Sequence, residues 1–242
     1  DATNLGREFQ FPHVLLLNDL EATGFGLEVL RPDELFTLNA GTPAPQANRA
    51  LIAAGTGLGE AILFWDGARY VVAATEGGHC DFAPRNDTEI ELLRFLKKRH
   101  EFADFELILS GRGFRTLHEF LDPSIKHPTF DTPGADPAPE ITQLGLAGSC
   151  PVCVKALAMF AEIYGAEAGN LALKCLARGG VYVAGGIAVK ILDKLRDGAF
   201  VRSFCAKANF GILLSQIPIY IVLNTDVPLL GAAARAAAVG GA

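Results

Sequence analysis

The sequence predicts an α/β domain built around a mixed β-sheet. Three strand candidates follow one another closely between residues 50 and 75, and further along the chain helical segments alternate with single strand-like runs. Half of the 242 residues are apolar and a fifth are charged, which is ordinary for a globular protein that buries a sizeable core. Strands followed by alternating helices and strands are typical of α/β architecture.

The beginning of the chain predicts one helix and one buried strand. Residues 1–10 favour a short helix. The unbroken apolar run at 14–17 is typical of a strand covered on both faces, and it ends abruptly in polar residues. Residues 21–38 look helical and then irregular, and the Pro- and Gly-rich residues 39–49 indicate a connection.

Strand signals dominate the next part, at 50–55, 59–65 and 69–75. The Asp-Gly pair in "DGAR" predicts a hairpin between the last two of these strands. A loop follows at 76–86. Asn86 with Glu89 three residues later predicts the start of a helix that runs to about His100.

The remaining chain alternates between helices and strands. "FELILSGRG" predicts a strand and then a glycine turn, "FRTLHEFL" predicts a helix, and the proline-rich residues 122–140 predict no regular element. The elements expected after them are a long helix at about 153–177, a strand in "GGVYVAGG", helical residues 187–207, a strand in "IPIYIVLN" and a last helix in "VPLLGAAARAAAV".

Charge and hydropathy limit what the chain binds. A formal net charge of −6 argues against nucleic acid and against an anionic membrane as partners. No apolar stretch approaches the ~20 residues that a membrane-spanning helix requires. No basic segment followed by an apolar one marks a secretory signal, so we expect a cytoplasmic protein. The chain opens on Asp1 and its only methionine is Met159, so we expect that an N-terminal portion is absent.

The five cysteines are odd in number and irregularly spaced, which indicates reduced thiols. In "SCPVC", a two-residue gap would let Cys150 and Cys153 reach one metal ion, but no second pair and no Cys/His partner follows at similar spacing. We favour small buried or helix-start thiols and predict no metal ligand.

The stretch "AAGTGLG" between two strand candidates has two interpretations. Glycines let backbone N–H groups converge on an anion, and the hydroxyl of Thr56 adds a donor. The P-loop pattern, however, contains a lysine and leads into a helix. This stretch has no lysine, and a strand candidate follows it. Taken alone, a structural turn is the better explanation for Gly55, Thr56 and Gly57.

Other polar and glycine motifs follow apolar runs. Asp19 comes at the end of one, where ligand sites are frequent in α/β folds, although taken alone a helix cap is the better explanation. "EGGH" brings Glu76 and His79 around two glycines, as a binding loop or as a solvated turn. "LSGRG" and "VAGGIA" either present helix N-termini to an anion or nucleotide, or are ordinary strand-to-helix turns.

The combination of these motifs is far more specific than any one of them. "LLNDLEA", "AAGTGLG", "EGGHCDFAP", "LSGRG", "VAGGIA" and "VPLLGAAA", in this order and at this spacing, resemble the bacterial-type glucokinase family from about residue 10 onward. The resemblance implies the ribonuclease-H-like (actin-like ATPase) fold of the hexokinase–actin superfamily: mixed sheets and two α/β lobes, with the active site in the cleft between them.

The resemblance also implies a division of the chain. Family members carry an Asp-x-Gly-Gly-Thr-Asn loop ahead of the "ND" strand, and this sequence has no such loop. Residues 1–29 and 222–242 would then be remnants of an incomplete small lobe, and residues 30–221 the large lobe. We expect residues 1–242 alone to be weakly active or inactive.

The implied activity is transfer of the γ-phosphoryl group of ATP to the 6-hydroxyl of glucose, giving glucose 6-phosphate, with Mg²⁺ carried on the nucleotide phosphates. Asp19 matches the family's catalytic base. The positions that match sugar-binding residues are Asn18, Asp19, Glu76, His79 and Glu106. Those that match nucleotide-binding positions are Gly55, Thr56, Gly57, Gly111, Gly185 and Gly186. A homodimer is implied by the same resemblance.

Two alternatives remain. The protein could phosphorylate another hexose or an amino-hexose, or it could be a non-catalytic sugar-binding regulator on the same fold. The repressor-and-kinase branch of the superfamily has a Cys-rich zinc motif after its "EGH" segment, whereas Cys80 here is followed by Asp81 and Phe82, which favours the glucokinase branch. Asp19 argues against a regulator, because sensing a sugar needs hydroxyl contacts but no base.

Overall fold

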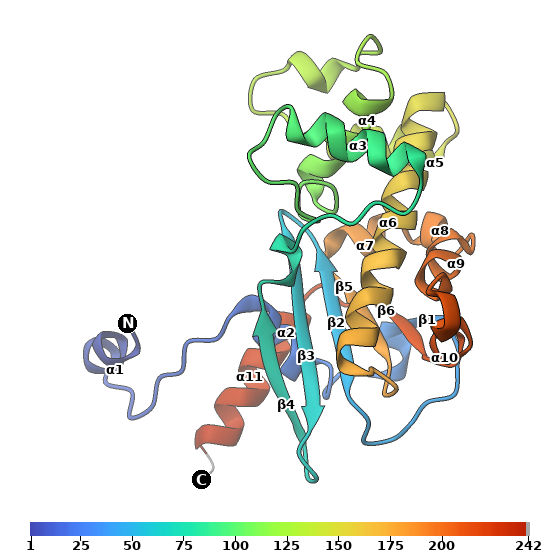
Figure 1. The fold of residues 1–242 in the computed structure, drawn as a ribbon. Helices are drawn as coiled ribbons and strands as arrows, with labels where there is room; N and C mark the ends of the chain where they lie inside the picture. Colours follow the sequence, from blue (N-terminus) through green and yellow to red (C-terminus); the bar gives the residue numbers. More distant parts are fainter. Residues whose placement is uncertain (241–242) are drawn as a thin grey trace.

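The computed structural model describes residues 1–240 and contains one six-stranded mixed sheet in the order β1-β6-β5-β2-β3-β4 (Figure 1). The strands are β1 (Leu35–Asn39), β2 (Arg49–Ala54), β3 (Leu58–Trp65), β4 (Tyr70–Thr75), β5 (Val181–Ala184) and β6 (Ile219–Val222). The α-helices are α1 (Ala2–Phe9), α2 (Asp19–Gly26), α3 (Asp87–Lys97), α4 (Gly111–Leu121), α5 (Ala138–Leu146), α6 (Pro151–Cys175), α7 (Gly186–Lys190), α8 (Leu192–Leu195), α9 (Ala199–Cys205), α10 (Gly211–Ser215) and α11 (Val227–Gly240). The predicted α/β class is confirmed.

Strand directions bring three chain segments to one edge of the sheet. β2 pairs in parallel with β5, and β5 pairs in parallel with β6, so the carboxyl ends of these strands lie together. The other pairs, β1 with β6, β2 with β3 and β3 with β4, are antiparallel. In open α/β sheets, ligands bind just beyond the carboxyl ends of the strands.

The two faces of the sheet carry separate cores. One core is the larger and joins Ile52, Val183 and Ile221 of the central strands to buried residues of helices α4, α5, α6 and α9. The other lies under α2 and α11, where Leu20 and Val227 pack with strand residues of the opposite face. Burial on both faces explains why β5 and β6 are apolar almost throughout.

Helix α6 links the sheet to a helical group beyond its edge, formed by α3, α4, α5 and the first half of α6 (Figure 1). Its first half packs against α4 and α5, where the rings of Phe114 and Phe160 stack with centroids 4.2 Å apart. Further along, the buried hydroxyl of Tyr164 accepts a hydrogen bond from the N–H of Ala54 at 3.1 Å. This contact fixes the end of the central strand β2.

Local sequence signals are confirmed at two places. In the β3–β4 hairpin, Asp66 Oδ1 accepts from the N–H groups of Ala68 and Arg69, and Gly67 has φ +105°, as "DGAR" predicts. At the start of α3, Asn86 Oδ1 accepts from the N–H of Glu89 at 2.9 Å. Both signals act over four residues, which makes them independent of the tertiary fold.

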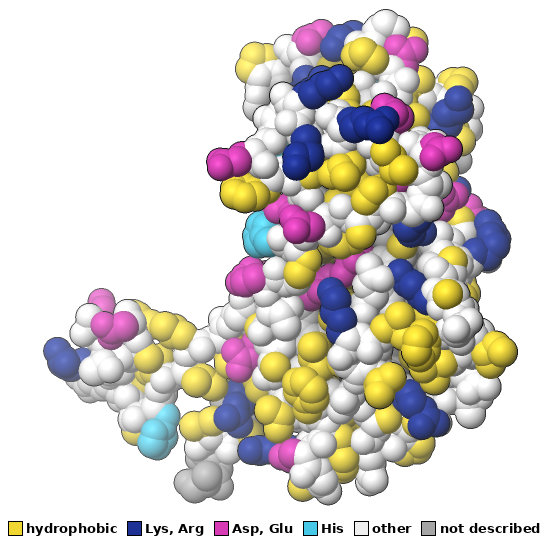
Figure 2. Space-filling model, in the orientation of Figure 1, with side chains coloured by type: hydrophobic (Ala, Val, Ile, Leu, Met, Phe, Trp, Pro, Cys, Tyr) yellow, Lys and Arg dark blue, Asp and Glu magenta, His cyan; other side chains and the backbone are white. Residues whose placement is uncertain are grey.

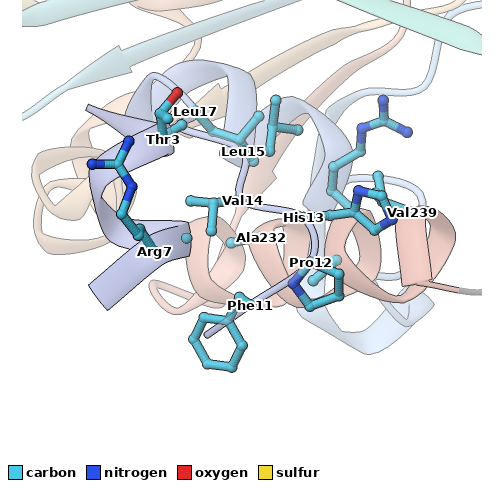
Figure 3. Close-up of a pocket in the computed structure, with 14 residues that line it drawn as sticks. Thr3, Arg7, Phe11, Pro12, His13, Val14, Leu15, Leu17, Ala232 and Val239 are labelled. Atoms are coloured by element: carbon cyan, nitrogen blue, oxygen red, sulfur yellow. The ribbon is translucent and has the colours of Figure 1, made fainter. Parts of the chain in front are cut away.

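The predicted buried strand at 14–17 is wrong. These residues run as irregular chain between α1 and α2, and Leu15 and Leu16 are 53% and 59% exposed. A buried strand needs a ladder partner, and in residues 1–240 no strand pairs with this one. The segment, α1 and α11 instead line an open cavity of about 880 Å³. Val14, Leu15 and Val239 are among the residues that line it (Figure 3).

The strand predicted in "FELILSGRG" is also wrong. The N–H groups of Ile108 and Leu109 both donate to the carbonyl of Phe105, which makes a helical turn that buries its apolar residues. Conversely, β1 and α5 form in residues for which we predicted irregular chain or no element. A short apolar run does not by itself distinguish a strand from a buried turn.

Two helices from opposite halves of the sequence, α2 and α11, pack against each other. Helix α2 lies along α11, and together they cover one face of the sheet (Figure 1). This contact joins the segments 1–29 and 222–242 that the family resemblance groups together. Their assignment to a separate small lobe stays a prediction.

Charged side chains of both signs are interspersed over the face of the molecule in Figure 2. Among residues 1–240 no single helix has both the length and the hydropathy to cross a membrane; α5 and α6 reach them only as a pair bent by 100°.

Candidate functional site

A cavity of about 370 Å³ lies where the carboxyl ends of β2, β5 and β6 meet. It brings together most of the residues that the sequence motifs single out: Asn18, Asp19, Gly55, Thr56, Gly57, Glu76, Glu106, Gly185 and Gly186. These residues come from five separate places in the chain. The cavity therefore combines polar side chains with bare glycine backbone.

The start of α2 holds the first two of these residues. Asn18 is the N-cap of the helix, and its Oδ1 accepts from the N–H of Leu20 at 2.8 Å. Asp19 is the first helical residue, and one of its carboxylate oxygens accepts from the same N–H, also at 2.8 Å. The capping interpretation therefore applies to Asn18, while both side chains line the cavity.

The glycine motif forms a closed turn between β2 and β3. The N–H of Gly55 donates to the carbonyl of Gly57 at 2.8 Å. The carbonyl of Gly55 in turn accepts from the N–H of Gly111 at 2.8 Å, at the first residue of α4. This bond brings the N-terminus of an 11-residue helix next to the glycine turn, and such a terminus attracts negative charge.

Glu106 lies directly beside this turn. Its Oε2 accepts from the N–H of Leu58 at 3.1 Å, and its own N–H donates to the carbonyl of Gly78 at 2.9 Å. A Cβ at Gly57 would come within 2.4 Å of Oε2, so a glycine is required there for the carboxylate to take this position. The guanidinium of Arg112 lies 3.8 Å from the other oxygen, Oε1.

His79 lies next to Glu106, and its side chain is about half exposed. Its Nδ1 is 3.0 Å from Oδ2 of Asp104, and its Nε2 is 3.9 Å from Oε2 of Glu106. The hydrogen bond to Asp104, followed by the charge of Glu106, raises the pKa of His79 above its usual value. His79 is not among the residues that line the cavity; it contacts the site through Glu106.

A second cavity of about 500 Å³ continues from the first, and the two share Gly55, Thr56 and Gly186. It contains Gly111, and residues 134–139 form one wall. A Cβ on Gly55 or Gly186 would meet nothing within 4 Å, so both glycines leave the cavity floor open. All six glycine and threonine positions predicted for a nucleotide thus lie on one cavity or the other.

The two cavities suit different chemistry. The first offers the carboxylates of Asp19, Glu76 and Glu106, which accept hydrogen bonds from hydroxyl groups. The glycine turn and the start of α4 lie between the cavities and favour an anion. The arrangement therefore fits a polyhydroxyl compound next to a phosphorylated one.

Several residues of this site were not predicted from the sequence. Asn224 and Thr225, in the loop after β6, line the first cavity, and Asp104 holds His79. Asp104 lies only two residues before Glu106, and this proximity is the one signal that could have pointed to it.

A separate group of possible metal ligands lies in the helical group. His118, His127, Cys150 and Cys153 place their ligand atoms within 4.8 Å of one another. The histidine partners that the "SCPVC" motif lacks downstream are therefore supplied from upstream.

Comparison with solved structures identifies the fold. A glucokinase from an Antarctic psychrotroph matches with a TM-score of 0.85 and 30% identity, over 96% of this chain and 71% of that one. A ROK family glucokinase from Streptomyces griseus, solved in complex with glucose and AMPPNP, matches with a TM-score of 0.63 over 96% of this chain and 70% of that one. At 20% identity this second likeness concerns the fold alone. The protein has the actin-like ATPase fold of the sugar kinases.

The family follows from the sequence comparisons. The sequence model of the glucokinase family matches residues 1–239. A glucokinase from Nostoc sp. is 40% identical over 255 residues, covering 98% of this chain and 75% of that protein. The chain therefore belongs to the glucokinase family, and it spans about three quarters of the length of this relative.

Proposed function

We propose that the protein transfers the γ-phosphoryl group of ATP to the 6-hydroxyl of glucose, giving ADP and glucose 6-phosphate. The observation that carries this proposal is that Asp19 and the glycine turn 55–57 line the same cavity. Phosphoryl transfer depends mainly on positioning the two substrates and stabilising charge. Membership of the glucokinase family supports this choice among hydroxyl-phosphorylating reactions.

Asp19 is proposed as the general base. One carboxylate oxygen is engaged by the N–H of Leu20, which holds the group in place at the start of α2. The other would accept the proton of the sugar 6-hydroxyl as the new O–P bond forms and the bond from the γ-phosphorus to the bridging oxygen of ADP breaks. A positioned base contributes about 10²–10⁴-fold to a rate.

The other sugar contacts are proposed from the same cavity and its margin. The carbonyl oxygen of Asn18 caps α2, so we assign its NH₂ group to a sugar hydroxyl. Glu76 and Glu106 would accept from ring hydroxyls. His79, held by Asp104, would complete the set beside Glu106.

The nucleotide is proposed to extend from the glycine turn into the second cavity. Because Gly55 closes the turn through its own N–H, the N–H groups of Thr56 and Gly57 are those we assign to phosphate oxygens. Gly111, Gly185 and Gly186 would line the rest of the nucleotide. The open floor at Gly55 and Gly186 supports a bulky ligand, since a Cβ there meets no protein atom within 4 Å. The AMPPNP reported in the Streptomyces griseus relative is consistent with this choice of donor.

Mg²⁺ is proposed as the ion that accompanies ATP, where it would neutralise phosphate charge. A hard cation of this kind takes its ligands largely from phosphate oxygens and water. No residue of this chain is assigned to it.

An assay of glucose-dependent ADP release tests the proposal. Because the sequence lacks the Asp-x-Gly-Gly-Thr-Asn loop, the assay uses residues 1–242 and also the same chain fused behind the corresponding segment of the Nostoc relative. We expect ADP release with glucose in the fused form. Glucose binding without ADP release from either form would instead identify a sugar-binding regulator, and faster turnover of mannose or glucosamine would identify another hexose or amino-hexose as the substrate.

We also propose a cytoplasmic location, a homodimeric state and a division of the chain into two lobes. Five cysteines without a disulfide support a reducing, cytoplasmic environment. The family resemblance supports a homodimer, which sedimentation velocity would detect. It also supports residues 1–29 and 222–242 as parts of a small lobe.

A further inference from the structure

Four side chains that the proposed reaction does not use converge in the helical group beyond the sheet edge. His118 lies on α4, His127 just before the short helix at 128–131, and Cys150 and Cys153 at the start of α6. The Nε2 atom of His127 is 3.2 Å from Sγ of Cys153 and 3.7 Å from Sγ of Cys150. One ligand atom from each of the four residues lies within 4.8 Å of every other.

His118 supplies an independent observation. It is fully buried, yet within the part of the chain that the structure describes neither Nδ1 nor Nε2 has a hydrogen-bond partner. A buried polar group without a partner is costly and therefore rare. Its ring packs edge-on to Phe130 and to His127, with centroids 4.9 and 5.1 Å away. Such an imidazole needs a ligand, and the two thiols and the second histidine surround it.

We propose that His118, His127, Cys150 and Cys153 bind one Zn²⁺ ion. Zinc prefers four tetrahedral nitrogen and sulfur ligands, with Zn–S near ~2.3 Å and Zn–N near ~2.0 Å. Tetrahedral geometry with these bond lengths places neighbouring ligand atoms about 3.3–3.8 Å apart. The two sulfur-to-nitrogen distances of 3.2 and 3.7 Å lie close to this range. Two thiolates also balance the charge of the ion, whereas Mg²⁺ and Ca²⁺ prefer oxygen ligands.

The proposed role of the zinc is structural. Four protein ligands fill a tetrahedral ion and leave no position for a substrate. The ion would tie α4 and the His127 segment to the start of α6. Apart from the four proposed ligands, packing and a hydrogen bond from Arg115 to the carbonyl of Phe130 already connect α4 to the His127 segment. The residues between His127 and Cys150 include 134–139, which wall the second cavity. Zinc would therefore also hold the wall of the proposed nucleotide site in place.

Metal analysis of the purified chain tests this proposal. The protein is prepared under reducing conditions from zinc-supplemented cells, dialysed against a weak chelator and analysed by mass spectrometry for metals. We expect about one zinc per chain in the wild type and at least a tenfold loss in Cys153→Ser. Cys175→Ser is the matched control, because Cys175 is also buried on α6 but donates to the carbonyl of Leu171. It should keep the metal.

Cobalt substitution keeps the test decisive if Cys153→Ser does not fold. Wild-type protein stripped of metal and titrated with Co²⁺ should develop the intense visible bands of tetrahedral cobalt together with thiolate charge-transfer absorption. Zinc added afterwards should abolish both. Zinc content no higher in the wild type than in Cys153→Ser, cobalt spectra without thiolate bands, or a Cys150–Cys153 disulfide in protein alkylated without reductant would each overturn the proposal.

Discussion

The backbone N–H of Leu58 donates to the carboxylate of Glu106 across 3.1 Å, so the residue that follows the glycine turn holds an acidic group in the lining of the cavity. Leu58 and Glu106 are 48 residues apart in sequence. Their contact links the proposed phosphate side of the site to the proposed sugar side. A substitution in the glycine turn should therefore alter sugar binding through Glu106.

Gly57→Ala should displace Glu106 and weaken glucose binding. The new Cβ would lie 2.4 Å from Oε2 of Glu106, a clash that the side chain relieves only by giving up the bond to Leu58. We expect the Kd for glucose, measured by calorimetry, to rise at least tenfold. Gly55→Ala is the control, because its Cβ meets no atom within 4 Å, and it should leave glucose affinity within about twofold. Equal affinities in the two variants would contradict this role of Glu106.

Gly185 and Gly186 should respond differently to alanine. Gly185 has φ +86°, and a Cβ there would lie 2.4 Å from the carbonyl of Ala54, so Gly185→Ala should lower the free energy of unfolding by ~1–3 kcal/mol. Gly186 has open space beside it, so Gly186→Ala should leave stability nearly unchanged and raise the KM for ATP. Urea unfolding and initial-rate kinetics measure both effects. A Gly185→Ala variant as stable as the wild type would contradict the geometry.

The imidazole of His79 should titrate above its ordinary pKa of 6.5 because it bonds to Asp104. Its charged form is favoured in the folded state, so any contribution to stability is present below pH 6.5 and is lost as pH rises through the raised pKa. NMR titration of the ring should place the pKa lower in Asp104→Asn than in the wild type. Glu106→Gln should lower it less, since Glu106 is the smaller cause. The reverse order would contradict the assignment of Asp104 as the main partner.

Glu60 should make stability depend on pH. It is 1% exposed on β3, and burial together with the charge of Glu167 raises its pKa from 4.5 to about 7, against the opposing charge of Lys174. The folded state therefore holds the proton of Glu60 more tightly than the unfolded state does. This preference adds to the free energy of unfolding in full below pH 4.5, and the contribution is lost as pH rises through about 7.

The expected loss of stability over this interval is on the order of 3 kcal/mol. Glu60→Gln, which is neutral at every pH, should show a smaller fall in the free energy of unfolding between pH 4.5 and 8. Glu91→Gln, at an exposed position on α3, should fall as the wild type does. Identical pH profiles for Glu60→Gln and the wild type would exclude this effect.

Elements with short-range signals were predictable from the sequence. Strands β2, β3 and β4 carry apolar runs and a hairpin motif, and α3 carries its own cap, so their prediction needs no knowledge of the rest of the fold. Residues 14–17 form an apolar run like those of β2 and β3. They do not form a strand, because a strand needs a neighbouring strand to pair with its backbone groups. β1 was missed because its sequence, LFTLN, has no unbroken apolar run and directly follows the polar residues Pro32–Glu34.

The site was predictable to the extent that it lies in motifs. Glycine turns and the "ND" and "EGGH" motifs mark the cavity, whereas Asp104 acts only through its contact with His79. The four residues of the proposed zinc site could not be grouped from spacing. Cys150 lies 23 residues after His127 and on a different element, so only the fold brings them together.

The kinetics of Asp19→Asn test the assignment of the general base, in whichever form of the protein turns over faster, with Glu21→Gln on the same helix as the control. We predict that kcat falls by about 10²–10⁴-fold in Asp19→Asn while the Kd for glucose changes less than about threefold, because the amide keeps its place beside Leu20 but takes no proton. Glu21→Gln should retain kcat. An Asp19→Asn variant that phosphorylates glucose at the wild-type rate would show that Asp19 is not the base.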